Sequence, residues 1–245
     1  MKKQIYLIIA LTGVLLLLPT ICSAITNVKT NSLDVTDIDG NVYKTVKIGT
    51  QTWMVENLKT TKFNDGTKIP NITDNELWSR LNTPAYCFYN NDVTLRTKYG
   101  ALYNWYSVNT GKLAPKGWHV PSDYDWTMLE NYLIANGSNY DGTTSGNEIA
   151  KSMAAATGWI ANRSTGTIGK DLTKNNTSGF TGRPGGSRYD FGAFYDIGGY
   201  GDWWTSTKYD EYTAFYRTLH YNSSCIMREI GGNKYGRSVR CVRDH

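Results

Sequence analysis

Hydrophobic and polar residues alternate in the last third of the chain, and this pattern predicts β-strands. Because successive side chains of a strand point to opposite faces, residues 214–221 divide into two sets. These sets are Phe215, Arg217, Leu219 and Tyr221 on one face, and Tyr216, Thr218 and His220 on the other. The alternation returns over residues 224–229, with Ser224, Ile226 and Arg228 on one face and Cys225, Met227 and Glu229 on the other. From Tyr200 to Asp244 the pattern predicts three or four antiparallel strands, with one face free to contact another molecule.

A second group of strands is predicted near the beginning of the chain. Residues 42–48 alternate, and residues 49–51 separate them from an apolar run at 53–55, which predicts strand, turn and strand. The preceding residues 37–41 (DIDGN) resemble the start of a calcium-binding loop, but Ile48 stands where such a loop needs glutamate. We therefore predict a hairpin turn here.

Helical periodicity occurs in the middle of the chain. Residues 99–106 predict a short helix, and residues 148–157 predict an amphipathic one. Ser122 is typical of a helix N-cap, and the helix that it begins is predicted to end at residues 136–137. The buried stripe of this helix is predicted to be Trp126, Leu129 and Leu133. The glycine-rich residues 163–201 predict an ordered loop held down by aromatic side chains.

The tryptophans separate into core positions and one exposed position. The predicted core tryptophans are Trp53, Trp105, Trp118, Trp126 and Trp204. Trp203 precedes Trp204 in a predicted strand and so faces the opposite way, which predicts an exposed side chain. The tyrosine, serine and asparagine residues nearby are typical of a recognition surface, although they could also be ordinary surface residues. The predicted ligand-binding residues are Tyr200, Trp203, Tyr209, Tyr212, Tyr216, Thr218, His220, Asn222, Ser223, Met227 and Glu229.

The composition predicts a folded, exported protein of the cell envelope or extracellular space. Hydrophobic residues make up 40% of the chain and aromatic residues 13%, which is enough for a core. Residues 1–24 have the order of a signal peptide, residues 25–33 are predicted to be a linker, and residues 34–245 the domain. Removing the two lysines of the signal lowers the formal charge from +5 to +3, too little to indicate a nucleic-acid partner. Membrane attachment is expected only if Cys22 carries a lipid.

No cluster of residue types predicts a catalytic or metal site, and we predict no cofactor. His119 is predicted to be hydrogen-bonded and structural, and no histidine has the spacing of a metal ligand with Cys, Asp or Glu. Without Cys22 the chain retains Cys87, Cys225 and Cys241, so at most one disulfide can form within it. Cys225 and Cys241 could bridge across the sheet, but a buried Cys241 and an exposed Cys225 is the preferred interpretation.

Several sequence blocks follow one another in a characteristic order. They are residues 53–58 (WMVENL), 99–105 (YGALYNW), 117–122 (GWHVPS), 204–207 (WTST) and 238–244 (SVRCVRD). Together the blocks resemble the Fibrobacter succinogenes major paralogous domain, over about residues 34–244. The resemblance implies an α+β, C-type lectin-like fold, in which two or three helices flank a twisted antiparallel sheet. Formylglycine-generating enzymes share that fold, and their strand-to-helix step is similar to residues 120–126. Ala114 stands where many members have a cysteine, which leaves Cys241 without that partner.

The mixture of tyrosine, serine and asparagine on the C-terminal face predicts an exported, non-enzymatic recognition or adhesion domain that binds a glycan or protein ligand through its C-terminal strands. The calcium-ligand motifs of sugar-binding lectins are missing from the sequence, so binding without metal is expected. Relatives are targets of diversity-generating retroelements, which implies that the C-terminal face varies in sequence. Two alternatives stay open: a thiol oxidase similar to the formylglycine-generating enzymes, and a structural surface subunit without a ligand.

Overall fold

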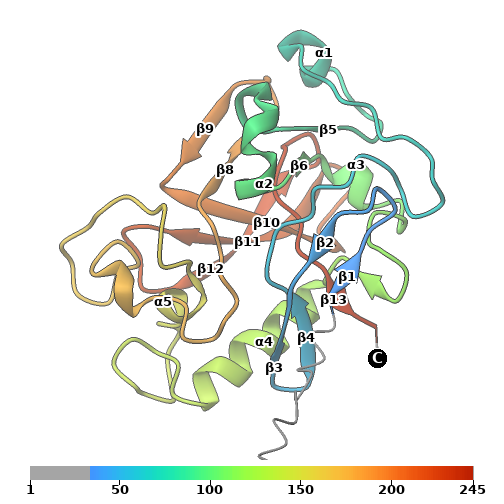
Figure 1. Cartoon of the computed structure of the whole chain (residues 1–245). Helices are drawn as coiled ribbons and strands as arrows, with labels where there is room; N and C mark the ends of the chain where they lie inside the picture. Colours follow the sequence, from blue (N-terminus) through green and yellow to red (C-terminus); the bar gives the residue numbers. More distant parts are fainter. Residues whose placement is uncertain (1–33, 245) are drawn as a thin grey trace, which may run out of the picture. The chain divides into compact units, whose positions relative to one another are not determined.

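Strands dominate residues 34–244, the part of the chain that the computed structural model describes, and a few short helices accompany them (Figure 1). The strands are β1 Val35–Thr36, β2 Val42–Tyr43, β3 Thr45–Ile48, β4 Gln51–Met54, β5 Tyr86–Cys87, β6 Leu102–Tyr103, β7 Trp118–His119, β8 Gly185–Arg188, β9 Phe194–Ile197, β10 Tyr200–Lys208, β11 Thr213–His220, β12 Ile226–Gly232 and β13 Val242–Arg243. The helices are α1 Asn75–Ser79, α2 Arg96–Tyr99, α3 Trp105–Val108, α4 Asp123–Ala135 and α5 Ala150–Met153, with short 3-10 helices at Tyr89–Asn91, Val93–Leu95 and Leu172–Lys174. This mixed α+β architecture agrees with the predicted class. The predictions for the signal peptide, the linker, Cys22 and His245 lie outside the described residues.

The largest sheet has five strands in the order β12-β11-β10-β8-β9. Strands β10, β11 and β12 are antiparallel neighbours, which confirms the strands predicted from the alternating pattern. The register places Tyr216 opposite Glu229 and Thr218 opposite Met227, so these four side chains share one face. Arg217 and Leu219 of β11 are buried on the other face.

The last described strand, β13, belongs to a different sheet. It lies between β4 and β7 in a four-stranded sheet of order β3-β4-β13-β7. Val242 pairs with Trp53 on one side and with His119 on the other. The end of the described chain therefore lies beside its beginning, and not beside β12 (Figure 1).

Trp203 and Trp204 point to opposite sides of β10, as predicted, but both side chains are fully buried. Trp203 packs against Trp126 and Phe180, and its indole N–H donates a hydrogen bond of 2.8 Å to Asn57 Oδ1. The prediction that Trp203 is exposed is therefore wrong. Helix α4 and the segment around Phe180 cover this face of the sheet. Strand alternation predicts which face a side chain lies on, but it does not predict whether another element covers that face.

Helix α4 begins and ends where the sequence predicts. Ser122 Oγ accepts a hydrogen bond from the Asp125 backbone N–H, and the Asp125 carboxylate accepts one from the Ser122 N–H, which makes a capping box. Asn136 is the C-cap, and Gly137 follows with a φ of 69°. The predicted stripe is confirmed by the burial of Trp126, Leu129 and Leu133. The helix contacts β3, β10 and β11, so it joins the two larger sheets.

The two other predicted helices are shorter than their periodicity indicates. Strand β6 occupies the middle of residues 99–106, and α3 begins only after Asn104, whose side chain caps it. Helix α5 makes one turn within residues 148–157, because the Ala155 N–H donates to the Gly182 carbonyl instead of continuing the helix. Tertiary hydrogen bonds have replaced helical ones in both segments.

Of the remaining structural predictions, the hairpin and the ordered loop are confirmed, and the burial of Trp118 is the exception. Strands β1 and β2 pair across residues 37–41, and the Asp37 carboxylate accepts backbone N–H groups of its own turn, which confirms the hairpin. Residues 163–201 are ordered, contain β8 and β9, and bury Phe180 completely. Trp118 is the exception among the predicted core tryptophans, because it is only half-buried in β7.

Candidate functional site

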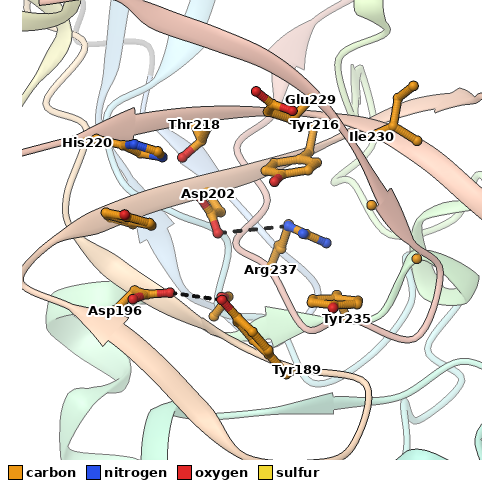
Figure 2. A pocket seen from close by; sticks show the side chains of 14 residues that line it. Tyr189, Asp196, Asp202, Tyr216, Thr218, His220, Glu229, Ile230, Tyr235 and Arg237 are labelled. Atoms are coloured by element: carbon orange, nitrogen blue, oxygen red, sulfur yellow. Dashed lines mark hydrogen bonds and ion pairs between the residues drawn. The ribbon is translucent and has the colours of Figure 1, made fainter. Parts of the chain in front are cut away.

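A pocket of about 330 Å³ opens on the face of the five-stranded sheet that carries Tyr216, Thr218 and His220 (Figure 2). Strands β8 to β12 supply most of its lining, and the remaining residues are Tyr189, between β8 and β9, and Tyr235 and Arg237, after β12. The lining residues are Ser187, Tyr189, Asp196, Tyr200, Asp202, Tyr216, Thr218, His220, Glu229, Ile230, Gly231, Gly232, Tyr235 and Arg237.

The registers of β10, β11 and β12 bring polar side chains together on this face. Residues at every second position of a strand face the pocket, and facing positions on adjacent strands lie side by side. The facing pairs are Tyr200 with His220, Asp202 with Thr218, and Tyr216 with Glu229. A continuous polar and aromatic surface therefore crosses three strands.

Arg237 lies at the centre of the pocket with its guanidinium between two tyrosine rings (Figure 2). Its Cζ is 3.8 Å from the ring centre of Tyr216, 4.7 Å from that of Tyr235 and 4.4 Å from that of Trp204. Gly231 leaves room for it, because a Cβ at that position would lie 2.7 Å from both Nη1 and Nη2. Attraction between the cation and the aromatic faces stabilises this buried arginine.

Asp202 is the buried counter-charge of Arg237. Its Oδ2 lies 3.9 Å from Arg237 Nε, close enough for electrostatic attraction but too far for a direct hydrogen bond. Burial raises the pKa of Asp202, and the attraction of Arg237 opposes that shift. Two opposite charges without a direct hydrogen bond between them thus occupy the base of the pocket.

Aromatic rings and further carboxylates form the walls. Tyr200 and His220 stack with ring centres 3.8 Å apart and an angle of 7° between the rings. Burial lowers the pKa of His220, which favours its neutral form. The Tyr189 hydroxyl donates to Asp196 Oδ2 at 3.3 Å, and Glu229 is exposed. Flat aromatic faces beside polar acceptors are suited to a small polar ligand.

The structure brings some of the predicted ligand-binding residues together and separates others. Those that line the pocket are Tyr200, Tyr216, Thr218, His220 and Glu229. Trp203 lies in the core on the opposite side of the sheet. Those outside the lining are Tyr209 and Tyr212 between β10 and β11, Asn222 and Ser223 after β11, and Met227 on β12.

Sequence reasoning missed Tyr189, Asp196, Asp202, Tyr235 and Arg237. Asp202 carries a usable signal, because strand alternation places it on the same face as Tyr200. Arg237 carries none, because it lies outside the named strands. Its position depends on a long-range contact, in which its backbone N–H donates to the Tyr103 carbonyl at 3.0 Å.

His119, predicted to be structural, lies between two carboxylates away from the pocket. Its Nδ1 is 2.7 Å from Asp244 Oδ1, and its Nε2 is 3.3 Å from Asp125 Oδ2. The hydrogen bond with Asp125 raises the pKa of His119, burial opposes it, and Asp244 adds to the rise. Burial raises the pKa of Asp125, but hydrogen bonds with His119 and Ser122 outweigh this and lower it to about 2.

Thermal stability is expected to respond to these two shifts in opposite pH ranges. The raised pKa of His119 stabilises the fold fully below the ordinary histidine value of 6.5, and this contribution is lost as pH rises through the raised value. The lowered pKa of Asp125 stabilises the fold above the ordinary value of 3.8, and this contribution is lost as pH falls toward about 2. The melting-temperature difference between wild type and His119→Gln should therefore be larger at roughly pH 5 than at roughly pH 9. An equal difference at both pH values would contradict the assignment.

The three cysteines of the described residues are free thiols. Cys241 is buried, as the preferred interpretation predicts, and Cys87 is buried too, whereas Cys225 is half-buried and not fully exposed. Burial raises the pKa of Cys87 to about 12 and also raises the pKa of Cys241. Within residues 34–244, no group of three or more His, Cys, Asp or Glu side chains is arranged to hold a metal ion. None of the helices in that range has the length and hydrophobicity needed to cross a membrane.

The described residues form a mixed α+β domain, mostly of strands, with a polar pocket on its largest sheet. The family model described as Fibrobacter succinogenes major domain matches residues 46–243. The chain belongs to this family, which confirms the family predicted from the sequence blocks. Comparisons with curated proteins and with solved structures gave no match.

Proposed function

We propose that this chain is an exported recognition domain that binds a glycan in the pocket on the β10–β12 face. The observation that carries the proposal is the combination of stacked aromatic rings, carboxylates and a buried arginine in one concave site. Its volume of about 330 Å³ lies at the lower end of the range for small-ligand sites, roughly 300 to 1,000 Å³. A pocket of this size fits a terminal sugar better than it fits a flat protein surface.

The properties of the thiols and of His220 favour a binding function over a thiol-oxidase function. A thiol oxidase needs an accessible thiolate, whereas burial raises the pKa values of Cys87 and Cys241 and so disfavours their thiolate forms. Cys225 lies outside the pocket lining. The neutral form of His220, which stacks on Tyr200, suits a role as an aromatic surface.

The finer fold assignment that accompanies this proposal is the C-type lectin-like class. Support comes from the antiparallel β10–β12 strands and from the pairing of β13 with β4, which brings the two ends of the described domain together. Export to the cell envelope or extracellular space is proposed on the signal-peptide pattern of residues 1–24.

The experiment that tests the function is a glycan array probed with the wild-type protein and two single variants. Tyr200→Ala removes one aromatic wall and is expected to weaken binding roughly 2- to 10-fold. Tyr209→Ala is the matched control, because Tyr209 is 57% exposed and lies outside the pocket. If no glycan binds, or if both variants lose binding equally, the pocket is not the glycan site.

A protein ligand is the second candidate, favoured by the exposed tyrosines between β10 and β11. Tyr209 is 57% exposed and Tyr212 is 71% exposed. Tyrosine gives a large contact area at a low cost in side-chain entropy, so it is common in protein-binding surfaces. Loss of binding to a protein ligand in Tyr209→Ala, with unchanged binding in Tyr200→Ala, would favour this candidate.

Ligand binding is expected to be unchanged after treatment with EDTA. The pocket carboxylates include Asp202, which faces Arg237, and Asp196, which accepts a hydrogen bond from Tyr189, so each already has a protein partner. Calcium sites need several convergent oxygen ligands. Isothermal titration before and after chelation measures the effect, and a loss of affinity that added calcium restores would contradict the prediction.

We also propose that the C-terminal face is diversified by a retroelement, as the family resemblance implies. Exposed positions such as Tyr212 and Asn222 can change without disturbing the core. Thr218 differs, because it is 2% exposed and opposite Asp202, so changes there are expected to reduce stability. The test is the neighbouring DNA, which should contain a near-copy of the segment for residues 200–244 beside a reverse transcriptase gene. A neighbourhood without such a copy would exclude this mechanism.

A further inference from the structure

Arg237 has hydrogen-bond donors that no protein group satisfies. The residue is 4% exposed, and within residues 34–244 its Nε and Nη1 have no hydrogen-bond partner. Buried donors nearly always have a partner, which can be protein, water or a bound molecule. Because Arg237 lines the pocket, the partner of these donors in the complex is expected to be the ligand.

The gap between Arg237 and Asp202 defines the chemistry of that partner. The two side chains are 3.9 Å apart at Nε and Oδ2, so neither forms a direct hydrogen bond with the other there. An oxygen about 2.8 Å from each atom could accept from Nε and donate to Oδ2. A hydroxyl group does both, whereas an ammonium group only donates and a carboxylate only accepts.

We propose that the pocket selects a neutral saccharide, one of whose hydroxyls sits between Asp202 and Arg237. This inference rests on the proposed function and specifies its ligand class. The hydroxyl accepts from Arg237 Nε and donates to Asp202 Oδ2, and a second ligand oxygen can accept from Nη1. The stacked Tyr200–His220 pair offers a flat surface to the sugar ring.

The charges around the gap disfavour ionic ligands of either sign. An anionic sugar would accept from Arg237 but would meet the carboxylate of Asp202, with those of Asp196 and Glu229 also in the lining. A cationic sugar would pair with Asp202 but would lie against the guanidinium and leave its donors unsatisfied. A neutral polyhydroxyl ligand meets neither cost.

The first test is a glycan array that holds neutral, acidic and amino-bearing versions of the same hexose-based oligosaccharides. Wild type is expected to bind the neutral versions best. Binding confined to the acidic or amino versions would overturn this inference but leave glycan recognition standing. Binding to none of the glycans would overturn both.

The second test measures affinity for the best neutral oligosaccharide by titration calorimetry. Asp202→Asn keeps the side-chain volume but removes the charge, and Arg237→Lys keeps the charge but removes Nε. Each is expected to weaken binding about 10-fold or more, because hydrogen bonds to charged groups are the stronger ones. Tyr124→Ala, at a 70% exposed position of α4 outside the pocket, is the control and should bind as wild type does. Wild-type affinity in both pocket variants would overturn the proposal.

A third measurement avoids variants that could fail to fold. The Arg237 Nε–H resonance of the ¹⁵N-labelled wild-type protein should shift when the neutral oligosaccharide saturates the site, because Nε gains an acceptor. Saturation without any shift of that resonance would place the ligand elsewhere and overturn the proposal.

Discussion

Replacing Trp203 by alanine is expected to lower the free energy of unfolding by about 3 to 5 kcal/mol. The side chain is fully buried and packs in an aromatic cluster, with ring centres 6.3 Å from Trp126 and 6.0 Å from Phe180. Its removal leaves a cavity that these large rings can fill only in part. The loss also removes the hydrogen bond from the Trp203 indole N–H to Asn57. Chemical denaturation followed by circular dichroism measures the change.

The matched control for this prediction is Tyr212→Ala, an aromatic truncation at a position that is 71% exposed. Its effect on the free energy of unfolding should stay within about 0.5 kcal/mol. Similar losses in both variants would show that Trp203 does not carry the core packing described above. The comparison also tests whether Trp203, which strand alternation predicts to be exposed, is buried in the core.

Arg217→Ala is expected to destabilise the fold by about 3 to 5 kcal/mol, because it leaves two carboxylates without their buried partner. Arg217 is 1% exposed in its side chain, with Nη1 2.6 Å from Asp123 Oδ1 and Nε 2.5 Å from Glu130 Oε1. Burial raises the pKa of Glu130, so this carboxylate depends on Arg217 to stay ionised. The interaction joins β11 to α4 across the core.

Arg228→Ala is the control, because Arg228 pairs with the same carboxylate of Asp123 from a side chain that is 49% exposed. Solvent screens such a pair, so its loss should cost at most about 1 kcal/mol. Equal destabilisation by the two arginine variants would contradict the distinction between buried and exposed pairs at Asp123. The double variant Arg217→Ala/Arg228→Ala shows whether the two changes in the free energy of unfolding are additive.

Local patterns predicted the elements whose stability is decided nearby in the sequence. Helix α4 begins at Ser122 because a side-chain cap and an acidic first turn act within a few residues of each other. The period of two in β11 predicts that Tyr216 and His220 share one face of the strand, and both line the pocket. The family assignment also came from short local blocks.

Long-range contacts set the length of α5 and the burial of Trp203, for which predictions from local patterns are wrong. Residues 148–157 have helical periodicity, yet the hydrogen bond from Ala155 to Gly182 ends α5 early. Trp203 was predicted to be exposed because alternation gives the side of a strand but not its covering. Both errors concern partners that lie far away along the chain.

Residue order is enough to predict the family, the antiparallel strands β10 to β12 and the two faces of β11, because these depend on patterns over neighbouring residues. The approach of Asp202 and Arg237 to 3.9 Å depends on the folded chain, because a hydrogen bond from the Arg237 backbone N–H to the Tyr103 carbonyl holds Arg237 in place, and Tyr103 is far away in the sequence. A pocket is defined by distances between remote segments, and burial changes the chemistry of each group within it. Neither the distances nor the burial can be obtained from residue order alone.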